Sequence, residues 1–69
     1  MSAATLRTAT PFRRKRLALG LTAAELGRAT GFSASKTLRI ERDPGRARLA
    51  DIDRLAETLA RLEVAAGRQ

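Results

Sequence analysis

Residues 20–42 read GLTAAELGRATGFSASKTLRIER and show two short helical patterns separated by a glycine. Thr22 and Glu25 have the spacing of a capping box, in which each side chain satisfies a backbone N–H group of the first helical turn. Leu26 follows at helical spacing, and Gly31 ends the pattern, because glycine most easily adopts the left-handed conformation found after a helix. We therefore predict a first short helix that starts after Thr22 and ends at Gly31.

The second pattern begins at Ser33, which is a good N-cap residue. Thr37 and Ile40 recur at i, i+3 and are expected to face inward. The opposite face of the same helix collects polar, apolar and basic side chains at helical spacing: Ser35, Leu38, Arg39 and Arg42. A helix, a glycine turn and a helix with a basic outer face form a helix-turn-helix, whose second helix is suited to the major groove of DNA.

These residues resemble the phage repressor/Cro-type (XRE-like) helix-turn-helix family, in the pattern G-L-T-x-x-E-L-x-x-x-x-G-x-S-x-S-x-x-x-R-I-E-R. The similarity runs without a gap from Phe12 to about Ala60. It implies an all-α fold, a compact lambda-repressor-like bundle of four or five helices. The resemblance also implies that the chain binds operator DNA, usually as a dimer.

The expected organisation is one domain with two tails. Residues 1–10 are small and polar without apolar periodicity, so we expect a disordered N-terminal tail. Within this tail, Arg7 either belongs to an arm that lies along DNA or is part of a flexible segment without a DNA contact. Residues 11–66 form the helix-turn-helix DNA-binding domain, and residues 67–69 form a C-terminal tail.

A first helix is expected over residues 11–19, with Thr10 as its N-cap and Pro11 in its first turn. Phe12, Arg16 and Leu19 share one face of it. Leu17 is expected to cover the edge of the core.

A last helix is expected over residues 49–66, with leucine and isoleucine side chains at spacings of three and four. We expect its core residues to be Leu49, Ile52, Leu55 and Leu59. Apolar side chains near and beyond the edge of the bundle predict a dimer contact made by Leu59, Leu62, Val64 and Ala66.

The charge supports a polyanionic partner. The net charge is +7, and residues 1–48 hold eleven of the fourteen basic side chains with only three of the seven acidic ones. This distribution favours nucleic acid on one side of the molecule and a protein contact at the C-terminal helix. The alternative is a solvated basic surface that keeps a small protein soluble.

The composition argues against several other classes. The chain has no cysteine and no histidine, so it lacks the usual general base, the thiolate nucleophile and the common zinc ligands. We expect no enzyme, cofactor or metal site. RNA binding is disfavoured because no tyrosine or tryptophan offers a stacking platform.

No apolar run is long enough to span a bilayer. The expected location is the cytoplasm. We expect the protein to be bacterial or phage-encoded and associated with the nucleoid.

The resemblance implies roles for individual residues. The base contacts would come from Ala34, Ser35, Leu38 and Arg39, of which Arg39 is the strongest candidate because arginine can bind both major-groove acceptors of guanine. The phosphate contacts would come from Thr22, Ser33, Lys36, Arg42, Arg46, Arg48, Arg13, Arg14 and Arg28. Arg46 and Arg48 are alternatively solvated loop residues. Arg16 and Glu41 would form a structural ion pair between the first helix and the one after the turn.

Four positions depart from the family pattern. Ala23 stands where glutamine is frequent, Ala34 is not polar, Gly27 replaces alanine at the close approach of two helices, and Thr37 buries a hydroxyl group. These departures predict sparse direct readout of bases, with more dependence on phosphates and DNA shape.

The first functional hypothesis is a sequence-specific transcriptional regulator, a repressor or autoregulator, that binds a palindromic operator in double-stranded DNA as a homodimer. The alternative is a helix-turn-helix interaction module, such as an antitoxin or adaptor, whose partner is a toxin or antagonist protein. Neither hypothesis requires a small-molecule ligand or a membrane.

Overall fold

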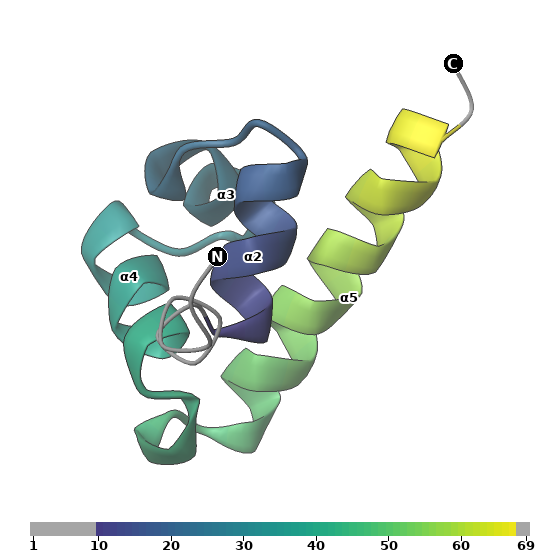
Figure 1. Cartoon of the computed structure of the whole chain (residues 1–69). Coiled ribbons are helices and arrows are strands. Elements are labelled where there is room, and N and C mark those ends of the chain that lie inside the picture. The colour runs from purple at the N-terminus through teal and green to yellow at the C-terminus, as the bar shows by residue number, and fades with distance from the viewer. Residues whose placement is uncertain (1–9, 68–69) are drawn as a thin grey trace, which may run out of the picture.

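The computed structural model describes residues 10–67, and within them every regular element is helical (Figure 1). The elements are α2 (Pro11–Ala18), α3 (Ala23–Thr30), α4 (Ala34–Arg42), the single 3-10 turn η1 (Pro44–Arg46) and α5 (Leu49–Gly67). This arrangement confirms the prediction of an all-α bundle, with four α-helices in the described part of the chain. The N-terminal tail predicted over residues 1–10 lies, apart from Thr10, outside the described residues.

The helix N-termini are set by the capping residues that the sequence indicates. The hydroxyls of Thr10, Thr22 and Ser33 accept hydrogen bonds from backbone N–H groups three residues later. At α3 the capping box is complete, because the backbone N–H of Thr22 donates to the carboxylate of Glu25 at 2.8 Å. Gly31 ends α3 with φ of 92°, a left-handed conformation that favours glycine.

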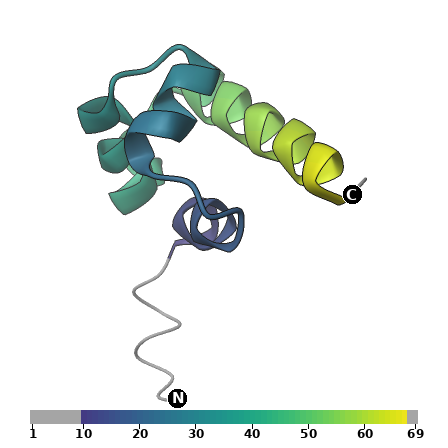
Figure 2. The same ribbon diagram turned by 90° about the horizontal axis from the view of Figure 1, so that it is seen from above.

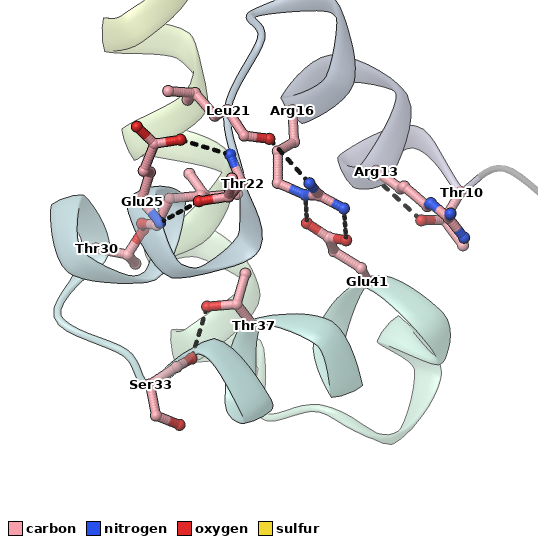
Figure 3. Close-up of polar contacts among 11 residues, drawn as sticks. Thr10, Arg13, Arg16, Leu21, Thr22, Glu25, Thr30, Ser33, Thr37 and Glu41 are labelled. Atoms are coloured by element: carbon pink, nitrogen blue, oxygen red, sulfur yellow. Dashed lines mark hydrogen bonds and ion pairs between the residues drawn. The ribbon is translucent and has the colours of Figure 1, made fainter.

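The backbone of the turn between α3 and α4, and a side chain of α4, lie very close to Gly27. A Cβ atom on this residue would lie 2.5 Å from the carbonyl oxygen of Phe32 and 2.8 Å from the hydroxyl oxygen of Thr37. The predicted close approach is therefore correct. The buried hydroxyl of Thr37 donates to the carbonyl oxygen of Ser33 at 2.9 Å (Figure 3).

The core is small and draws on three helices. Leu26 of α3, Ile40 of α4, and Leu55 and Leu59 of α5 are buried. Around them pack partly buried apolar residues, among them Phe12, Leu19, Phe32, Ala47, Ile52 and Leu62.

Two predictions about the core are wrong. Leu49 is 78% exposed, because it is the first residue of α5 and lies at the end of the bundle. Leu17 is 55% exposed, so it does not close the edge of the core as expected. A prediction about the dimer contact also changes, because Leu62 is partly buried against the core instead of lying beyond it.

α5 is the longest helix, and its C-terminal part extends past the other helices (Figures 1 and 2). It continues through Gly67, one residue beyond the predicted end of the domain. Lys15 of α2 lies 3.9 Å from the carboxylate of Glu63 along this part.

Across residues 10–67, no helix has both the length and the hydropathy that a bilayer-spanning segment requires.

Candidate nucleic-acid interface

A buried ion pair fixes how α4 is rotated in the bundle. The Nε and Nη2 atoms of Arg16 donate to the two carboxylate oxygens of Glu41 at 2.7 and 3.1 Å, and Nη1 donates to the carbonyl oxygen of Leu21 at 2.9 Å (Figure 3). Both side chains are almost fully buried. The contact predicted between these two residues is therefore confirmed, and it holds Glu41 on the inner face of α4.

Because Thr37, Ile40 and Glu41 face inward, the opposite face of α4 is turned to solvent. The exposed side chains of this outer face are those predicted from the spacing, Ser35, Leu38, Arg39 and Arg42. Within the described residues, neither Arg39 nor Arg42 has a carboxylate within 4.0 Å. Ala34, at the start of the helix, is half-buried.

The outer face of α4 continues into an open cavity of about 680 Å³ between the end of α4, η1 and the start of α5. We call this cavity the basic hollow. Its charged lining consists of five cations and two carboxylates, namely Lys36, Arg39, Arg42, Arg46, Arg48, Asp43 and Asp51. The excess of positive charge makes the hollow suited to phosphate groups.

Two of the cations in the basic hollow already have partners. Nζ of Lys36 lies 3.3 Å from a carboxylate oxygen of Asp51 and 4.5 Å from the centre of the Phe32 ring. Nε of Arg46 lies 3.4 Å from Asp43, but this pair is largely exposed. The cations without such partners in the described structure are therefore Arg39, Arg42 and Arg48.

The remaining predicted phosphate contacts lie elsewhere on the surface. Arg13 and Arg14 are exposed on α2, and Arg28 is exposed in the last turn of α3. None of these three residues lines the basic hollow. They are therefore exposed basic side chains outside this pocket.

The capping residues at the N-termini of α3 and α4 are engaged within the fold. The backbone N–H of Thr22 donates to Glu25 within the capping box. The hydroxyl oxygens of Thr22 and Ser33 also accept backbone hydrogen bonds, at 3.1 Å in both cases. Each of these two side chains can therefore still donate its hydroxyl hydrogen to a ligand.

Of the residues predicted for the dimer contact, the structure leaves Val64 and Ala66 accessible and excludes Leu59. Leu59 has no exposed surface, because it is part of the monomer core, so it cannot contact a second copy. Val64 is 57% exposed, and Ala66 is exposed next to it. An open groove of about 420 Å³ along the outer side of α5 is lined by Glu57, Ala60, Arg61, Val64 and Ala65.

Asp43 and Asp51 were not identified as members of the site from the sequence. Asp51 lies in the first turn of α5, where an acidic residue commonly interacts with the helix dipole. Its contact with Lys36 depends on where the start of α5 lies relative to α4, on the far side of η1, which no local pattern encodes. For Asp43, the spacing of three residues to Arg46 was the available signal.

Comparison with protein families identifies a match over nearly the whole chain. The model of a helix-turn-helix domain matches residues 4–67. Comparisons with curated proteins and with solved structures gave no match. The matched range contains all four described helices and the α3–turn–α4 unit. The chain therefore belongs to the helix-turn-helix domain family.

Proposed function

We propose that this protein is a sequence-specific DNA-binding transcriptional regulator of the repressor/Cro type. In this proposal it binds DNA and is not an enzyme. In this proposal α4 enters the major groove, and Arg39 reads a guanine through its two major-groove acceptors. Ser35, Leu38 and Ala34 provide weaker contacts to neighbouring bases. The regulator represses transcription or controls its own expression.

The observation that best supports this proposal is that the exposed face of α4 is continuous with the basic hollow. The exposed face of α4 carries Arg39 and Arg42, and both residues also line the basic hollow. A helix seated in the groove would thus have the phosphate backbone beside it at Arg42, Arg46 and Arg48. Phosphate contacts set the position of a protein on DNA, and base contacts select the sequence.

We propose that two copies bind a palindromic operator. Each copy would place its α4 in one half-site, about 34 Å from the other along the duplex. The dimer contact would use the exposed part of α5 around Val64 and Ala66, which extends past the bundle.

Equilibrium titration of a fluorescent duplex at several salt concentrations tests DNA binding. Arg42→Gln should weaken binding to all duplexes by a similar factor and reduce the slope of log Kd against log salt by about one. Lys15→Gln is the matched control, because it removes one charge from an exposed α2 residue outside the basic hollow. A folded protein that binds no duplex at about 50 mM salt would contradict the proposal.

The second candidate function is a protein-interaction module such as an antitoxin or adaptor. The exposure of Val64 and of Leu38, which is 44% exposed, favours it. Weak and sequence-indifferent DNA binding, together with tight binding to a protein encoded by the adjacent gene, would identify this alternative.

A further inference from the structure

We propose that Asp51 limits the affinity of this protein for DNA, because its carboxylate competes with DNA phosphates for the ammonium group of Lys36. This inference rests on the proposed function, since it concerns the strength of the same DNA contact. It assigns a role to an acidic residue inside a surface that is otherwise suited to a polyanion.

The geometry around Lys36 carries the argument. Its ammonium group lies 3.3 Å from a carboxylate oxygen of Asp51 and 4.5 Å from the centre of the Phe32 ring. The carboxylate attracts the ammonium by its opposite charge, and the ring attracts it through its π electrons, so both partners favour its present position. The ion pair is also partly shielded, with exposed side-chain fractions of 39% for Lys36 and 22% for Asp51.

Asp51 itself is held in place by its position in the fold. It lies in the first turn of α5, where the positive end of the helix dipole favours a carboxylate. Asp51 also lines the basic hollow, so its charge lies beside the space that a phosphate would occupy. A phosphate that binds Lys36 either replaces Asp51 as its partner or shares the three donors of the ammonium with it. In both cases the phosphate lies close to the negative charge of Asp51.

Removal of the Asp51 charge should therefore strengthen DNA binding. Asp51→Asn keeps the size of the side chain but removes both the competition for Lys36 and the repulsion of the phosphate. We expect about two- to fivefold tighter binding, which corresponds to the range measured for partly exposed ion pairs. The gain should be similar for a selected operator and an unrelated duplex, because it concerns a phosphate contact.

Asp53→Asn provides a matched control for net charge. Asp53 is on the same helix and exposed, but it does not line the hollow and is not paired in the described residues. Two residues along an α-helix correspond to a rotation of about 200°, so the two aspartates point in nearly opposite directions. At physiological salt the exposed charge of Asp53 is screened over about 8 Å, so Asp53→Asn should change the DNA affinity much less than Asp51→Asn does.

Lys36→Gln tests whether Asp51 acts through Lys36. With Asp51 present, this substitution removes an ammonium that is already engaged but leaves the Asp51 carboxylate unpaired, so it should weaken DNA binding less than it does when Asp51 is replaced by asparagine. In the Asp51→Asn background, the same substitution should cancel most of the gained affinity. A double-mutant cycle over the four proteins measures this coupling directly.

The experiment is anisotropy titration of the full chain and its variants on two duplexes at about 0.15 M salt, after thermal unfolding has shown each variant folded. Asp51→Glu, which retains the charge, should bind like the original protein. Equal effects of Asp51→Asn and Asp53→Asn, or weaker binding by Asp51→Asn, would overturn the inference while DNA binding itself stands. Failure of the unsubstituted protein to bind either duplex would instead refute the proposed function, and the inference with it.

Discussion

Arg16 and Glu41, 25 residues apart in the sequence, form a two-point ion pair with hydrogen bonds of 2.7 and 3.1 Å inside the bundle (Figure 3). This contact joins α2 to α4, and it places Glu41 inward so that Arg39 is turned to solvent. The pair therefore links the stability of the domain to the orientation of the proposed recognition helix.

Glu41→Ala should strongly destabilise the domain, because it leaves the guanidinium of Arg16 buried without its charged partner. The expected loss is about 3–5 kcal/mol in the free energy of unfolding, which is a large part of the stability of a domain this small. Urea unfolding followed by circular dichroism measures it. Glu63→Ala, which removes the partner of the largely exposed Lys15, should cost less than about 1 kcal/mol. Equal losses in both variants would contradict this account of the buried pair.

Gly27→Ala should destabilise the domain, although alanine is the better helix former by about 1 kcal/mol. The new methyl group would lie 2.5 Å from the Phe32 carbonyl oxygen, which belongs to the backbone and cannot rotate away. We expect a net loss of about 1–3 kcal/mol, typical of overpacking, in the same unfolding assay. Gly67→Ala is the control, since a Cβ there meets no atom within 4 Å, and it should leave stability unchanged or slightly increased.

The capping box predicts a pH dependence of stability. The backbone N–H of Thr22, followed by its side-chain hydroxyl, lowers the pKa of Glu25 below the ordinary 4.5. Because the folded-state pKa is lowered, this contribution is fully present above the ordinary pKa and is lost as the pH falls through the lowered value. Thermal unfolding between about pH 6 and about pH 3 should show a smaller decline for Glu25→Gln than for the original protein. Parallel declines would show that Glu25 does not supply this dependence.

Val64→Asp should shift a dimer towards monomer without unfolding the bundle, because Val64 is 57% exposed within one chain. A charge in an apolar contact between two copies would lack a partner. Analytical ultracentrifugation over a range of protein concentrations measures the effect. Leu49→Asp places the same charge at an even more exposed leucine at the other end of α5 and should leave association unchanged. If Val64→Asp associates as the original chain does, the dimer contact lies elsewhere.

The sequence predicted the local features of the fold well. The caps at Thr22 and Ser33, the left-handed Gly31 and the inward face of α4 depend on residues close together in the chain, and all are confirmed. The pairing of Arg16 with Glu41 is distant, and it was predictable only through the family resemblance.

Features that depend on how helices meet were not predictable from periodicity. Steps of three residues link Leu49 to Leu55 in the apolar pattern, but six residues of α-helix rotate by about 600°, so the two side chains point about 120° apart. Only Leu55 is buried. The spacing is also compatible with Leu59 in either the core or the dimer contact, and the structure allows only the core. The contact of Lys36 with Asp51 joins α4 to the first turn of α5, and no pattern within either helix specifies it.

The central claim is that Arg39 on α4 reads a base pair. Selection from a random duplex pool at about 0.15 M salt, run in parallel with Arg39→Ala and Arg42→Ala, tests it most directly. We expect the original protein to enrich a two-fold symmetric motif, Arg39→Ala to lose the preference at one base pair of each half-site, and Arg42→Ala to retain the motif with weaker binding. A folded protein that enriches no motif, or an Arg39→Ala variant that enriches an unchanged one, would contradict the claim.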